Sequence, residues 1–226
     1  MDICEMEKSS FIDYPNKIST VLFIKGCNFR CPYCHNSHIL NSKESIDETY
    51  ILTFLENRKK YIEAVTITGG EPTLYNELYT LISKIKNKNF YVKLDTNGTN
   101  PDMLNRLVQD NLIDYIAMDI KTSFSEYNKV TNSLVDINKI KKSIKVIKNS
   151  NIDYEFRTTV CKELISEYNI LDIAKHLNGS QKYILQNFRD GDTILGGINK
   201  YHSYKLEKLQ EIKCIIENSF DVCIIR

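Results

Sequence analysis

The chain has 226 residues, of which 42% are hydrophobic and 26% charged, as expected of a globular protein with one sizeable core or two small domains. The formal net charge of +1 leaves no electrostatic footprint for nucleic acid, and no apolar run approaches the length of a membrane span. The start of the chain lacks the basic residues and apolar run of a signal peptide. Seven cysteines, three of them close together, do not suit a secreted disulfide framework. We therefore expect a cytoplasmic protein that binds neither nucleic acid nor membranes.

Strands and helices are predicted to alternate along the chain after a lead-in over residues 1–17. This lead-in is expected to hold a short strand and a turn at Pro15 and Asn16, where Asn16 suits a left-handed backbone. Short apolar runs predict strands at 18–24, 63–68, 90–95, 113–120, 152–160 and 183–187, and a terminal strand at 221–225 is a weaker prediction. Apolar residues at helical spacing predict helices that end near residue 60 and cover about 74–85, 101–111, 137–147, 167–177 and 203–218. The first of these is expected to open with a capping box at 45–48, and residues 122–135 are expected to form a loop.

This alternation predicts βαβ units and a parallel sheet. No linker rich in proline or glycine interrupts it, so we expect a single domain over residues 1–226. Residues 18–190 would form its core, and 191–226 would add the last helix and the weaker terminal strand. In such folds the active site lies at the carboxyl ends of the strands.

Three cysteines follow the first predicted strand, in the loop at residues 26–36. Cys27, Cys31 and Cys34 are close enough for their thiolates to converge on one metal centre. A closed structural zinc site or a fully protein-ligated cluster needs a fourth ligand, and His35, directly after Cys34, is poorly placed to supply it. The spacing favours a metal centre with an open position, while a structural zinc site stays the alternative.

The cysteine loop resembles the cluster motif of the radical S-adenosylmethionine (SAM) superfamily, in its Cys-x-x-x-Cys-x-Tyr-Cys pattern over residues 27–34. The resemblance implies a partial (β/α)6 barrel of parallel strands with outer helices. It also implies one [4Fe–4S] cluster on Cys27, Cys31 and Cys34, with SAM on the fourth iron and Tyr33 near the adenine. Reductive cleavage of SAM would release a 5′-deoxyadenosyl radical.

Polar residues stand where the next three strands end. Gly69, Gly70, Glu71 and Pro72 resemble the superfamily's Gly-Gly-Glu-Pro motif, whose glycines would let the backbone approach the amino group of SAM. The segments with Asp95, Thr96 and Asn97 and with Asp119 and Lys121 resemble those of the glycyl-radical-enzyme activating subgroup. The resemblance implies contacts to SAM and a monovalent cation near Asp95 and Asp119, since two carboxylates in a buried cleft repel unless a cation compensates them. Alternatively, both aspartates cap the helices that follow.

Two further residues on later strands are candidates for binding SAM. Arg157 could hold the carboxylate of SAM with its planar fork, or it could form a structural ion pair with Glu71 or Glu155. Gln186 is a candidate for a polar contact with the adenosine.

The resemblance implies an activating enzyme that takes a hydrogen atom from a backbone glycine of a partner glycyl radical enzyme. Segments from residue 10 to residue 189 look like the activators of anaerobic ribonucleoside-triphosphate reductases, which makes such a reductase the expected partner. A flavodoxin or ferredoxin would supply the electron. Cys161 departs from the pattern; like the other scattered cysteines it is expected to be a small buried hydrophobe, and an extra thiol near the rim of the site is the alternative. The alternatives are a radical SAM enzyme that modifies another peptide or a small molecule, and a non-catalytic zinc-binding module.

Overall fold

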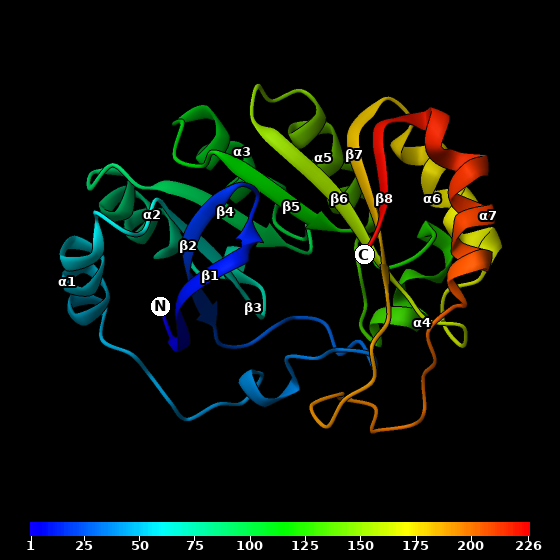
Figure 1. Cartoon of the computed structure of the whole chain (residues 1–226), viewed down its shortest axis with the longest axis horizontal. Coiled ribbons are helices and arrows are strands. Elements are labelled where there is room, and N and C mark those ends of the chain that lie inside the picture. The colour runs from blue at the N-terminus through cyan, green and yellow to red at the C-terminus, as the bar shows by residue number, and fades with distance from the viewer.

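The computed structural model describes all 226 residues and contains one eight-stranded sheet in the order β1 to β8 (Figure 1). The strands are β1 (Ile3–Tyr14), β2 (Lys17–Ile24), β3 (Ala64–Gly69), β4 (Tyr91–Thr96), β5 (Tyr115–Asp119), β6 (Asp153–Val160), β7 (Ser180–Asn187) and β8 (Phe220–Ile225). β1 and β2 pair antiparallel as a hairpin, and each later strand pairs parallel with the one before it. The two edge strands, β1 and β8, do not pair with each other, so the sheet is an open barrel, as predicted.

Helices connect the parallel strands on the way from one to the next. They are α1 (Glu48–Arg58), α2 (Leu78–Lys86), α3 (Pro101–Gln109), α4 (Tyr127–Thr131), α5 (Ile137–Lys148), α6 (Glu167–Leu177) and α7 (Leu206–Ile216). Figure 1 shows α1 and α2 beside one end of the sheet and α6 and α7 beside the other. None of these helices has both the length and the apolar character needed to cross a bilayer.

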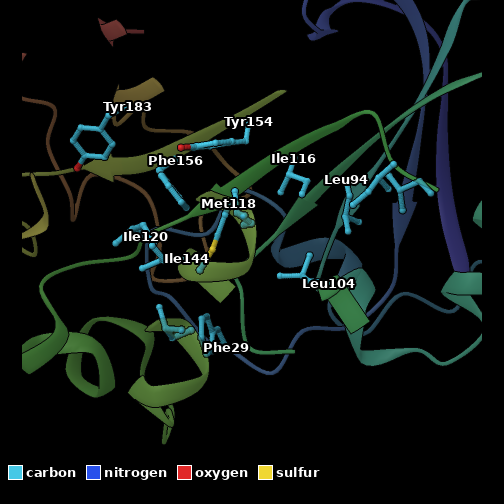
Figure 2. Packing of buried hydrophobic residues seen from close by; sticks show 14 of the residues in the cluster. Phe29, Leu94, Leu104, Ile116, Met118, Ile120, Ile144, Tyr154, Phe156 and Tyr183 are labelled. Atoms are coloured by element: carbon cyan, nitrogen blue, oxygen red, sulfur yellow. The ribbon is translucent and has the colours of Figure 1, made fainter. Parts of the chain in front are cut away.

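The main core has 47 buried residues and lies between the sheet and its helices. Figure 2 shows Ile116 and Met118 of β5 packed toward Leu104 of α3 and Ile144 of α5. Full burial of such a side chain stabilises the fold by about 1.5–3 kcal/mol relative to exposure. The apolar stripe of each helix therefore holds it against the sheet and places the strand ends in a fixed arrangement.

Several local predictions were wrong. The strand predicted within residues 1–17 is longer than expected, since β1 covers Ile3–Tyr14, whereas the predicted left-handed turn at Asn16 is confirmed with a φ of 61°. The cap of α1 is Asp47 and not a box from residue 45, because the Asp47 carboxylate accepts from both Thr49 and Tyr50 backbone N–H groups. Leu74 lies outside α2 and is 45% exposed. The predicted loop at 122–135 contains α4, which at five residues is too short to show a helical period.

Candidate active site

A cavity of about 190 Å³ lies at the carboxyl ends of strands β2 to β6. Of the predicted site residues, only Glu71, Pro72 and Gln186 do not line it. Those that do are Cys27, Cys31, Tyr33, Cys34, Gly69, Gly70, Asp95, Thr96, Asn97, Asp119, Lys121 and Arg157. Parallel strands bring these separate segments together because all their carboxyl ends meet at one edge of the sheet.

The three cysteines of the loop after β2 all face this cavity. Cys31 is buried, while Cys27 and Cys34 are partly exposed, and all are free thiols. Burial raises the pKa of the Cys27 thiol to about 11, so a bound cation would have to displace its proton at neutral pH. The thiols are not gathered at the short distances that a single ion requires. Ligands of a cluster bind different irons and stand further apart, which suits thiols spread around one cavity.

Gly69 and Gly70 allow two backbone segments to meet. A Cβ at Gly70 would lie 1.7 Å from the carbonyl oxygen of Gly26, so only glycine fits there. The Glu71 backbone N–H donates to the same Gly26 carbonyl at 2.9 Å. The two glycines therefore allow the turn after β3 to pack against the start of the cysteine loop, and they also line the cavity.

Glu71 is fully buried behind the cavity wall and lacks a cationic partner. Its carboxylate accepts hydrogen bonds from the Thr73 hydroxyl and backbone N–H, from the Thr96 hydroxyl at 2.8 Å, and from the Asn97 backbone N–H. Burial raises the pKa of Glu71, while these donors favour its charged form. Through these hydrogen bonds, Glu71 links the turn after β3 to the segment after β4.

Arg157 joins the two aspartates of the site. Its Nε donates to Asp119 Oδ1 at 2.8 Å, and its terminal nitrogen pairs with Asp95 Oδ2 at 3.3 Å. Lys93 and Lys121 add one further ion pair each, to Asp95 and to Asp119 at 3.0 Å. Burial alone would raise the pKa of both carboxyls, but the charge of Arg157, followed by those of the lysines, lowers the pKa of each below its usual range.

This network corrects two expectations. Arg157 pairs with neither Glu71 nor Glu155, and Glu155 instead contacts Tyr115 and Arg226. The helix-capping alternative is also wrong for the aspartates, because α3 is capped by Asn100 and the segment after β5 by no acidic side chain. Since three cationic side chains compensate Asp95 and Asp119, their mutual repulsion no longer requires a separate monovalent cation.

Tyr33 lies beneath the cavity with a hydroxyl group that has no hydrogen-bond partner in the protein. Burial raises its pKa far above the usual range, so it stays a neutral donor. A buried hydroxyl without a partner costs about 1–3 kcal/mol, which a bound group within reach would recover. Cys161 is fully buried and does not line the cavity, as expected of a small buried hydrophobe, and burial raises its pKa to about 12.

Several residues of the cavity wall were missed from the sequence: His35, Asn36, Thr68 and Thr159. Only the position of His35 and Asn36, directly after the last cysteine, could have indicated them. Gln186 lines a separate groove of about 770 Å³ that shares His35, Arg157 and Thr159 with the cavity. This groove extends the site toward the β1–β2 hairpin.

Known proteins resemble the chain over nearly its whole length. The family described as the radical SAM superfamily matches residues 21–174. A protein of Methanocaldococcus jannaschii, assigned as a glycyl-radical enzyme activating enzyme, is 36% identical and covers 96% of this chain and 92% of its own length. The pyruvate formate-lyase-activating enzyme of Clostridium pasteurianum is 28% identical and covers 94% of this chain and 91% of its own length.

A solved structure supports the fold alone. The crystal structure of Streptococcus suis SuiB bound to the precursor peptide SuiA superposes with a TM-score of 0.70 over 90% of this chain, at 16% identity. This chain spans 48% of that longer protein.

Proposed function

This chain belongs to the radical SAM superfamily of enzymes, and we propose that it is an activating enzyme that removes one hydrogen atom from a backbone glycine of a glycyl radical enzyme. The observation that carries the proposal is the match, over more than nine-tenths of both chains, to two activating enzymes. That likeness coincides with a cavity that gathers the expected cysteines and strand-end residues. Because the chain belongs to a superfamily of enzymes, the alternative of a non-catalytic zinc-binding module has no support.

The residues of the cavity fit a [4Fe–4S] cluster and SAM. Cys27, Cys31 and Cys34 would hold three irons and leave one for SAM, and together the bound cluster and SAM supply the radical that takes the hydrogen atom. The partnerless hydroxyl of Tyr33 is a donor at the cavity floor that a bound group would satisfy.

The polar wall has the charges that the amino-acid part of SAM requires. Lys121 carries the cationic group that would attract the carboxylate of SAM, and Asp119 holds it in place at 3.0 Å. Backbone carbonyls at Gly69 and Gly70 would accept from the amino group. Two nitrogen atoms of Arg157 are already paired with Asp95 and Asp119, so Arg157 acts mainly by positioning these carboxylates.

An anaerobic ribonucleoside-triphosphate reductase is the partner that we propose, because the motif segments resemble the activators of those reductases. Pyruvate formate-lyase is the second candidate, favoured by the likeness to its activating enzyme from C. pasteurianum. A flavodoxin or ferredoxin would provide the electron.

The decisive experiment is electron paramagnetic resonance on the anaerobically reconstituted protein, mixed with SAM, a reductant and the reductase from the same source. We expect a glycyl doublet on the reductase and none with Cys31→Ala, which lacks one cluster ligand. Pyruvate formate-lyase in a parallel sample tests the second partner. Cleavage of SAM to 5′-deoxyadenosine without a doublet on either enzyme would contradict the activating role and point to another substrate.

A further inference from the structure

The short helix α4 packs against the cysteine loop from behind the cavity wall. The backbone N–H of Arg30 donates to the Thr131 carbonyl at 2.9 Å, and the rings of Phe29 and Tyr127 meet edge to face with their centroids 6.5 Å apart. Phe29 lines the cavity that we assign to the cluster and SAM, whereas Tyr127 does not. Tyr127 is only 1% exposed, so its ring supports the cysteine loop without facing the cavity.

The hydroxyl group of Tyr127 also binds the segment that follows β5. It accepts a hydrogen bond from the backbone N–H of Lys121 at 3.1 Å, and no backbone carbonyl accepts from this N–H. The preceding residue, Ile120, is bound to β6, because its N–H donates to the Arg157 carbonyl at 2.8 Å and its carbonyl accepts from the Thr158 hydroxyl at 2.8 Å. Lys121 is therefore held by β6 through its neighbour and by α4 through its own backbone.

The chemistry of the Tyr127 side chain suits this contact. Burial raises the pKa of Tyr127 well above its usual range, so its hydroxyl group stays neutral. A neutral phenol can accept from the Lys121 N–H without adding a negative charge beside Asp119, whose carboxylate pairs with the Lys121 ammonium group at 3.0 Å. Phenylalanine has the same ring but no acceptor, and it would leave the Lys121 N–H without a partner in the protein.

We propose that Tyr127 is a positioning residue for SAM, which aligns Lys121 with the cysteines that hold the cluster. The inference rests on the proposed function, in which the ammonium group of Lys121 attracts the carboxylate of SAM. Tyr127 contacts both parts of that site, since its hydroxyl group binds the Lys121 backbone and its ring packs on Phe29, between the first two cysteines of the loop. An ammonium group that is already in place loses less conformational freedom when SAM binds, which raises the affinity for SAM.

The test measures SAM binding to the anaerobic, cluster-loaded protein by equilibrium dialysis with labelled SAM, which also reaches weak affinities. We expect Tyr127→Phe to weaken SAM binding about tenfold and to keep the wild-type iron content, because the ring that packs on Phe29 is retained and only the hydroxyl group is lost.

Tyr115→Phe is the matched control, because it also removes one hydrogen-bonded hydroxyl group from a buried tyrosine. Tyr115 is 5% exposed and donates to Glu155 at 2.9 Å, but it begins β5 and does not line the cavity. This variant should bind SAM with wild-type affinity.

A double-mutant cycle with Lys121→Met separates positioning from a general loss of structure. If Tyr127 acts through the Lys121 ammonium group, Tyr127→Phe should weaken SAM binding no further in a protein that already carries Lys121→Met. An equal loss in both backgrounds, wild-type SAM affinity or a loss of iron in Tyr127→Phe, or an equal effect of Tyr115→Phe would each overturn the proposal. No measurable binding of SAM to the wild-type protein would overturn it as well.

These measurements need no partner enzyme. A failure of the activating role would appear separately, as a missing glycyl signal in the resonance experiment, and would leave the SAM affinities unchanged.

Discussion

Replacement of Arg157 by methionine tests whether one guanidinium group holds the two aspartates of the site together. The side chain of Arg157 is only 12% exposed, and it contacts both Asp119 and Asp95. Methionine is unbranched, apolar and flexible enough to occupy similar space, so the change mainly removes the charge and its hydrogen bonds. The two carboxylates would then keep only Lys93 and Lys121 as partners.

The expected loss of stability follows from these contacts. Two opposite charges about 3 Å apart gain roughly 5 kcal/mol at an effective dielectric constant of 20. The cost of burying the guanidinium group, which methionine avoids, offsets much of that gain. Removal of one partner of a buried ion pair typically costs about 3–5 kcal/mol, and the two lysines soften the loss. We expect the free energy of unfolding to fall by about 2–4 kcal/mol at pH 7.

The dependence on pH separates this electrostatic effect from a packing defect. The pKa values of Asp95 and Asp119 are lowered in the folded protein. A carboxyl of this kind stabilises the folded state above its unfolded pKa of about 3.9, and that contribution is lost as the pH falls through the lower folded value. The difference between the wild-type protein and Arg157→Met should therefore be full at pH 7 and shrink below about pH 4.

The assay is urea unfolding of both proteins, followed by circular dichroism from pH 7 to about pH 3. Arg157→Lys, which keeps the charge but cannot reach both carboxylates with a planar fork, should fall between them. A loss below about 1 kcal/mol at pH 7, or one that is the same at pH 7 and pH 3, would refute the role assigned to Arg157.

Three further changes test the walls of the cavity. Gly70→Ala should prevent iron from binding and lower the melting temperature, because the new Cβ would collide with backbone, whereas Gly191→Ala has open space and should match the wild-type protein in both. Glu71→Gln should lower the free energy of unfolding by about 1–3 kcal/mol in urea titrations, since an amide group cannot accept from every donor around it. An unchanged unfolding midpoint would contradict the role of Glu71 in linking the segments after β3 and β4. Asn97→Ala removes the amide that lies 3.8 Å from the Cys27 sulfur, so the reduction potential of the cluster should become more negative in a spectroelectrochemical titration. A potential equal to that of the wild-type protein would show that this contact has no electronic effect.

The parallel sheet, the cysteine loop and the gathering of strand-end residues could be predicted from the sequence. Apolar runs alternating with helical patterns imply parallel strands, and parallel strands share one functional edge. The sequence therefore predicts Cys27, Asp95 and Asp119 at one site, and all three line the cavity. The cysteine motif is local in the chain, so its spacing predicts a metal centre with an open position, and its resemblance to the radical SAM motif implies the cluster chemistry.

The partners of the charged groups depended on the tertiary structure. Arg157 lies directly opposite Asp119 in the register of β5 and β6, and this register is set by the packing of the whole sheet, which no local pattern encodes. The motif at residues 69–72 predicts Glu71 as a residue that binds SAM, yet in the folded protein its carboxylate accepts hydrogen bonds from Thr96 and Asn97. One flank of the cysteine loop is covered because the backbone N–H groups of Leu195 and Gly196, far along the chain, donate to the carbonyls of Cys34 and Pro32. Sequence spacing determines which residues can meet, and long-range packing decides which of them do.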